Sequence, residues 1–167
     1  MKSCDLSSWA ALALPDLKRS FTAEHARTVT VTQAEGDRIR LFQLDPMVTI
    51  LYPDVQRRCD LAILRETENR RTLTFVELKG KDFASAEKQL LATWQSAQKE
   101  LPAGCRNETE YRFVIAGERQ AAPRQRRDGK RRKHKEPVPE LERLTGQPLQ
   151  FRRTPRGASV DITDLLG

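Results

Sequence analysis

The sequence predicts a mixed α/β domain in which at least one helix packs on a central sheet. Short β-branched runs separated by polar turns fill the first half of the chain and are typical of strands. One longer stretch, 82–101, has apolar residues at helical spacing along a single face. A further apolar run at 111–117 follows it and predicts another buried strand.

The first part of the chain favours a helix followed by strands. Residues 6–26 are helix-prone, with Pro15 interrupting this helix or starting a second one. Residues 28–33 (TVTVTQ) alternate with period two, and a turn separates them from a strand over 36–45. We expect these two strands to form a hairpin. Residues 47–54 are apolar and predict a further short strand or a covered loop.

Two apolar runs joined by a charged turn form the clearest strand pair. The runs are 59–64 (CDLAIL) and 72–78 (TLTFVEL), and RETENRR between them predicts a hairpin connection. The helix over 82–101 comes next. Asp82 is a good N-cap for it, and Pro102 predicts its end.

The last part of the chain predicts a short helix over 140–146 (ELERLTG), closed by its glycine. Residues 149–154 (LQFRRT) and 159–166 (SVDITDLL) are expected to form a closing hairpin over PRGA. We therefore expect one domain over 1–167 with a C-terminal extension at 138–167.

Composition excludes several classes of protein. With 167 residues, 38% of them hydrophobic and 32% charged, the chain fits one domain with its own core. Its longest apolar run, 9–14, is far shorter than the roughly 20 residues of a membrane helix, so no membrane contact is expected. The cysteines Cys4, Cys59 and Cys105 have neither disulfide-framework nor zinc-site spacing, which favours a cytoplasmic protein.

The net charge of +7 is concentrated in one segment. Residues 119–135 contain nine Lys or Arg and one acid, so the rest of the chain is nearly neutral. Such a block predicts contact with a polyanion, and we expect a basic, mobile segment at 119–137. The residues expected to bind nucleic acid are Arg124, Arg126, Arg127, Lys130, Arg131, Arg132, Lys133 and Lys135.

Charged residues stand at the ends of the two apolar strands. Asp60 opens the first strand, and Glu77 and Lys79, which point to the same side, close the second. If the strands pair, the two carboxylates lie close together and repel unless a cation separates them. A hard divalent ion bound by both carboxylates and the Leu78 carbonyl would resolve this repulsion. Lys79 would then stabilise charge on an attacked phosphate, a set that suits metal-assisted phosphodiester hydrolysis.

The pattern CDLAIL…TFVELKG…AEKQL resembles the PD-(D/E)XK nuclease superfamily, over about residues 54–117. The resemblance implies a restriction-endonuclease-like αβββαβ core with a central mixed sheet flanked by helices. It implies a catalytic set of Asp60, Glu77, Lys79 and Gln89, with Mg²⁺ as cofactor and Mn²⁺ able to substitute. The implied function is a metal-dependent endonuclease that hydrolyses phosphodiester bonds of nucleic acid, DNA more than RNA.

Several alternatives stay open at this point. Asp54, in the literal Pro53-Asp54 pair, is a second candidate for the first acid, and Glu24 is a candidate for an added acid. Thr93 stands where some branches of the superfamily have a tyrosine. The fold could also serve as a catalytically idle module that binds nucleic acid or an acidic partner through its basic segment. Because many nucleases of this fold pair up to cut two strands, a homodimer is one expectation.

Overall fold

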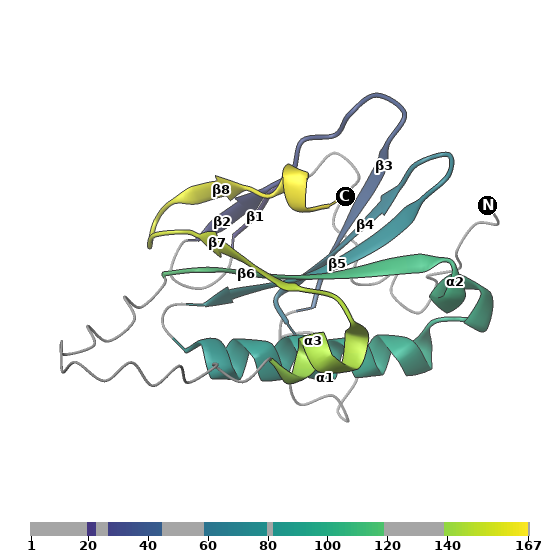
Figure 1. The fold of residues 1–167 in the computed structure, drawn as a ribbon. Coiled ribbons are helices and arrows are strands. Elements are labelled where there is room, and N and C mark those ends of the chain that lie inside the picture. The colour runs from purple at the N-terminus through teal and green to yellow at the C-terminus, as the bar shows by residue number, and fades with distance from the viewer. Residues whose placement is uncertain (1–19, 23–26, 45–58, 80–81, 119–138, 167) are drawn as a thin grey trace, which may run out of the picture.

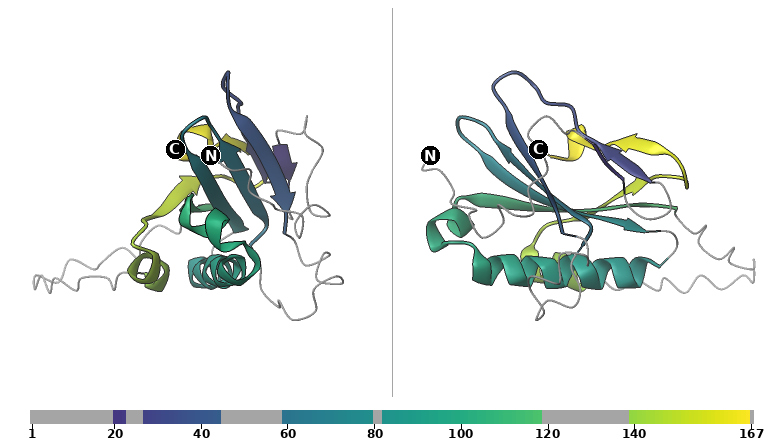
Figure 2. Two further views of the ribbon diagram at one scale, coloured as in Figure 1. Left: turned by 90° about the vertical axis from the view of Figure 1, so that its right-hand side faces the viewer. Right: turned by 180° about the vertical axis from the view of Figure 1, so that it is seen from behind.

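The chain forms a central sheet covered by helices on one face and by a second, smaller sheet on the other (Figures 1 and 2). The computed structural model describes residues 20–22, 27–44, 59–79, 82–118 and 139–166. The predicted mixed α/β class is confirmed.

The central sheet has five strands in the order β3-β4-β5-β6-β7. Neighbours β3, β4 and β5 are antiparallel, whereas β5, β6 and β7 run parallel, so the sheet is mixed. Parallel neighbours end at the same edge, which brings the carboxyl ends of β5, β6 and β7 together. The strands are β3 (Arg38–Gln43), β4 (Leu61–Glu66), β5 (Arg71–Lys79), β6 (Thr109–Gly117) and β7 (Leu149–Arg153).

The predicted hairpin of β4 and β5 is confirmed. Its turn is closed by the N–H of Thr67, which donates to the carbonyl of Arg70 at 2.9 Å. The Arg70 N–H donates in return to the Thr67 hydroxyl at 3.1 Å. Both strands bury apolar side chains on both faces, which explains why they read as continuous apolar runs.

Helices cover one face of this sheet, and α1 (Phe83–Glu100) is the longest of those described. As predicted, Asp82 caps it, because its carboxylate accepts from the Ser85 N–H at 3.0 Å. Residues at helical spacing face the sheet: Ala86, Leu90, Thr93 and Ala97. The short helices α2 (Ala103–Asn107) and α3 (Glu140–Thr145) follow. Gly146 caps α3, as predicted, and its conformation is left-handed.

The other face is covered by three short strands, with β2 (Thr28–Thr30) between β1 (Ser20–Thr22) and β8 (Ser159–Asp161). A short 3₁₀ turn, η4 (Thr163–Leu165), follows β8. Two apolar cores result, one on each face of the central sheet. Phe75 and Leu90 belong to the core beneath the helices, and Val76 and Val29 to the core beneath the small sheet.

Two predicted hairpins are wrong. The strand over 36–45 pairs with β4 and not with 28–33, because β3 buries Leu41 on one face and Phe42 on the other. It therefore needs cover on both faces, which only the central sheet provides. The C-terminal runs also separate: β7 joins the central sheet beside β6, and β8 joins the small sheet beside β2.

The predicted N-terminal helix is wrong at 20–22, where β1 pairs with β2 through alternating polar and apolar residues. The rest of that helix and the run 47–54 lie outside the described residues. Residues 139–166 are an integral part of both sheets, so the expected C-terminal extension contributes directly to the core.

Candidate active site

The hairpin register brings Asp60 and Glu77 together. The last pair of the β4–β5 ladder is Leu61 with Val76, so Asp60 stands opposite Glu77 one position further on. The Asp60 carboxylate accepts a hydrogen bond of 2.7 Å from the N–H of Leu78. Asp60 is therefore held against the end of β5, as the strand-end pattern predicted.

Glu77 is a buried carboxylate, with only 1% of its side chain exposed. It continues the row of Leu73 and Phe75 toward the face that α1 covers. Within the described part of the chain, neither of its oxygens makes a hydrogen bond of good geometry. The Lys79 ammonium lies 3.0 Å from its Oε1 atom and forms an ion pair with it.

The surroundings of Glu77 favour its neutral form. Burial of the carboxyl, followed by the negative charge of Asp60, raises the pKa of Glu77 to about 8. Lys79 acts in the opposite direction by stabilising the charged form, but it does not offset the burial. A further cation would stabilise the charged form of this carboxyl, because it would bind the buried oxygens and offset the repulsion from Asp60.

The helix α1 is tied to the segment that carries Asp60. The Cys59 N–H donates to the Thr93 hydroxyl at 2.7 Å, and that hydroxyl donates to the Gln89 carbonyl at 2.7 Å. Because Cys59 directly precedes Asp60, this bridge fixes the position of Asp60 relative to the helix. Thr93 is buried, and its role was not predicted, although a hydroxyl on an apolar helix face is the signal that could have revealed it.

Gln89 lies one turn before Thr93 and is half-buried at the border of the helix. The hydroxyl of Ser85 donates to its Oε1 atom at 3.4 Å. The carbonyl of Gln89 accepts from the Thr93 hydroxyl, so the main chain of Gln89 is part of the hydrogen-bonded bridge to Cys59 and Asp60. The predicted role of the Gln89 amide in catalysis stays a prediction.

The residues present fit a hard divalent cation in part. No group of three or more His, Cys, Asp or Glu side chains in the described ranges is arranged to hold a metal ion, so protein carboxylates alone would not saturate it. Mg²⁺ needs only one or two carboxylates and completes its six ligands with waters and substrate oxygens. The observation that favours such an ion is that both Glu77 oxygens are buried without a hydrogen bond of good geometry in the described residues, with only the Lys79 ion pair at Oε1.

The main chain at Leu78 offers a further oxygen. In a strand, the N–H and C=O of one residue point to the same side, and the Leu78 N–H points to Asp60. Its carbonyl therefore lies on the side of β5 where Asp60 stands, beyond the last ladder pair. The predicted ligand set is Asp60, Glu77 and this carbonyl.

Comparisons with known proteins assign the chain to no family. No protein-family model matches it, and no curated protein or solved structure is significantly similar to it. The resemblance to the PD-(D/E)XK superfamily therefore depends on the site residues alone. No helix within the described ranges is long and apolar enough to cross a bilayer.

Several predicted residues cannot be placed. The basic segment 119–137, with all eight predicted nucleic-acid-binding residues, lies outside the described residues, as do Asp54 and Glu24.

The cysteines differ from expectation, because Cys105 is disulfide-bonded while Cys59 is a buried free thiol. Burial, followed by the charge of Glu77, raises the pKa of the Cys59 thiol above its usual range, which favours the protonated thiol.

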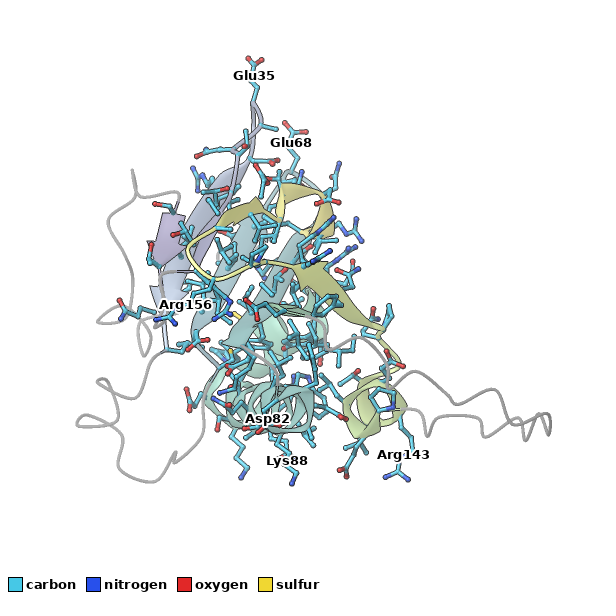
Figure 3. The ribbon with its side chains drawn as sticks, turned by 90° about the vertical axis from the view of Figure 1, so that its left-hand side faces the viewer. Glu35, Glu68, Asp82, Lys88, Arg143 and Arg156 are labelled. Carbon is cyan, nitrogen blue, oxygen red and sulfur yellow. The ribbon has the colours of Figure 1, made fainter. Side chains whose placement is uncertain are left out.

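Figure 3 looks onto the end of the molecule where β5 and β6 end and α1 begins. Asp82, at the first turn of α1, is labelled below the sheet, and Arg156 is labelled beside it. The Glu77–Lys79 pair belongs to this same end, because Lys79 is the last residue of β5.

Proposed function

We propose that the protein is a metal-dependent nuclease that hydrolyses phosphodiester bonds of nucleic acid, with DNA as the preferred substrate. The observation that carries the proposal is a buried carboxylate, Glu77, with a second carboxylate opposite and an ammonium 3.0 Å away. Burying such a cluster costs folding free energy, and carboxyls with strongly perturbed pKa values are concentrated at functional sites. Two acids and one cation at a strand end suit a divalent ion and a phosphate.

The arrangement of elements supports the proposal. A restriction-endonuclease-like αβββαβ core has a helix, three strands, a second helix and a fourth strand parallel to the third. The described elements β3, β4, β5, α1 and β6 follow the order of its last five elements, and no helix precedes β3 within the described residues. The acids lie on the second and third of these strands, and Gln89 lies on the helix. The preference for DNA follows from the resemblance alone.

The residues have separate roles in this proposal. Asp60, Glu77 and the Leu78 carbonyl would hold Mg²⁺ or Mn²⁺, which when bound would polarise the phosphate and acidify a water molecule. The Lys79 ammonium, half-exposed beside Glu77, would stabilise the charge that develops on the phosphate oxygens. Thr93 would position Asp60 through the Cys59 N–H.

The test is incubation of the full chain with labelled single-stranded DNA, duplex DNA and RNA of one sequence. Each reaction contains Mg²⁺, Mn²⁺ or a chelator, and a parallel set uses Glu77→Gln purified in the same way. We expect cleavage that needs metal and disappears in the variant. Cleavage that persists in Glu77→Gln would contradict the assignment. Binding without cleavage would favour the idle module instead.

A further inference from the structure

Arg153, at the end of β7, lies in the same row of the sheet as Lys79. The register pairs Lys79 with Gly117 on β6, and Gly117 with Arg153 on β7. Residues paired in this way point to the same face. The preceding row confirms the direction, because Glu77 pairs with Ile115 and Ile115 with Phe151, and both partners pack in the core beneath α1.

The row places the Cα atoms of Lys79 and Arg153 about 10 Å apart along one edge, since neighbouring strands are about 4.8 Å apart. Between them stands Gly117, which has no side chain. The first residue of α1, Phe83, packs edge-on against Phe151, with ring centres 5.3 Å apart. Arg153 is therefore one pleat beyond this contact, beside the beginning of the helix.

The arginines that the structure describes fall into two groups, and Arg153 belongs to the smaller one, which forms no ion pair with the described residues. Those of the larger group pair with an acid: Arg27, Arg40, Arg65, Arg70, Arg71, Arg112, Arg143 and Arg152. Arg153 is exposed and makes no ion pair or side-chain hydrogen bond with the described part of the chain. Its neighbour Arg152 faces the opposite side and pairs with Asp164.

The main chain beneath Arg153 is firmly held. The next residue, Thr154, is fully buried, and its N–H donates to the Gly117 carbonyl at 3.0 Å. The carbonyl of Thr154 accepts from the buried Arg27 side chain at 3.1 Å. Arg27 also pairs with Glu118 at 3.4 Å. Glu118 is the acid that directly follows β6, so its ion-pair partner is Arg27 and not Arg153.

We propose that Arg153 binds a phosphate of the nucleic-acid strand next to the phosphate that Lys79 faces. This inference rests on the proposed function and adds a substrate-binding residue to it. A guanidinium can donate two parallel hydrogen bonds to phosphate oxygens, which makes arginine well suited to this contact. Lys and Arg both have long side chains, so from backbone positions about 10 Å apart they can reach neighbouring phosphates of one strand.

The test compares Arg153→Ala with Arg38→Ala, each in the full chain. Arg38 is a matched control, because it is also exposed and unpaired within the described residues but lies at the opposite end of the sheet. Binding to a DNA oligonucleotide is measured in Ca²⁺ at several salt concentrations. We expect Arg153→Ala to bind about tenfold more weakly and to lose about one unit of salt slope. Arg38→Ala should match the parent.

A second measurement identifies the phosphate. Oligonucleotides carry one neutral methylphosphonate at successive positions around the binding site. At one position, neutralisation should weaken binding of the parent but not of Arg153→Ala, because the contact is already absent. Equal losses for both proteins at every position would overturn the inference.

The two proposals fail in different ways. If the parent never cleaves but Arg153→Ala loses affinity at one phosphate, the nuclease assignment fails and the contact stands. If the parent cleaves and Arg153→Ala binds as well as Arg38→Ala, the contact fails and the nuclease assignment stands. Melting curves of both variants should overlay the parent, because both side chains are exposed.

Discussion

Lys79 and Glu77 form an ion pair of unequal burial. Their Nζ and Oε1 atoms are 3.0 Å apart, and 29% of the Lys79 side chain is exposed against 1% of the Glu77 side chain. The cation is thus within reach of a ligand while the carboxylate lies beneath it. An exposed pair would contribute little. Here Lys79 lowers the pKa of the buried carboxyl, but burial and the charge of Asp60 still hold that pKa at about 8, so both partners are charged only above that pH.

The first prediction concerns stability and pH. In the absence of metal, we expect the free energy of unfolding to fall as pH rises from about 5 to 8. Native Glu77 holds its proton up to about pH 8, whereas the unfolded carboxyl loses it near 4.5, so the native state binds the extra proton. One such proton gives a slope of about 1.4 kcal/mol per pH unit.

Denaturant titrations at pH 5, 6, 7 and 8 in a chelating buffer measure this slope, and Glu77→Gln is the comparison. The variant carries no titrating carboxyl, so its profile should be flatter over this range. Parallel profiles for the two proteins would mean that Glu77 is ionised throughout.

The second prediction concerns metal affinity. Because Glu77 must release its proton to bind a cation, we expect the Mn²⁺ affinity to rise up to tenfold per pH unit and to level off above about pH 8. Asp60→Asn should weaken binding, whereas Glu140→Gln, on the exposed surface of α3, should not. Calorimetric titrations at pH 6.5, 7.5 and 8.5 provide the measurement, and equal affinities for Asp60→Asn and the parent would rule out Asp60 as a ligand.

The third prediction separates catalysis from folding at Lys79. Lys79→Ala should reduce cleavage on the order of a hundredfold, as is typical when a preorganised charge is removed from a transition state. Without the ammonium, the pKa of Glu77 should rise further, so the melting temperature should change little below pH 8, where the carboxyl is neutral. Cleavage and melting are measured together, and full cleavage by the variant would remove Lys79 from the mechanism.

The fourth prediction concerns Thr93. Thr93→Val keeps the shape of the side chain but removes the acceptor of the Cys59 N–H, which is then buried without a partner. We expect a loss of about 1 to 3 kcal/mol in unfolding free energy. Thr93→Ser retains the hydroxyl and should restore most of the cleavage rate. If Thr93→Val cleaves as well as Thr93→Ser, the bridge does not position Asp60.

The fifth prediction concerns the basic segment. Neutralising Arg131, Arg132 and Lys133 together should weaken binding to all sequences alike and lower the salt slope by about three. The salt dependence of oligonucleotide binding measures this effect. An unchanged slope would show that these charges do not contact phosphate.

How far the sequence predicts the structure depends on how local each signal is. The β4–β5 hairpin, α1 and its Asp82 cap are specified by short periodic runs and could be predicted, as could the meeting of Asp60 with Glu77. The partners of β2 and β3 could not, because both read as amphipathic strands and their pairing depends on which face each core covers.

In the candidate site, too, local sequence patterns predicted some features, whereas features that depend on tertiary packing were missed. Its charged residues were visible because charge at the end of an apolar strand is unusual. The Thr93 bridge and the burial of Glu77 were not, because they arise from the packing of a distant helix against the sheet. Arg153 was not singled out either, since its place beside Lys79 depends on two parallel strand pairings that connect segments far apart in the chain.

The pairing of β2 with β8 has a consequence for synthesis of the chain. The Thr30 hydroxyl donates to the Val160 carbonyl across 130 positions of sequence. At typical translation speeds of about 5 to 20 residues per second, roughly 6 to 26 s pass between the synthesis of β2 and that of β8. During that interval the apolar core around Val76 lacks the cover that Val160 of β8 provides in the folded protein.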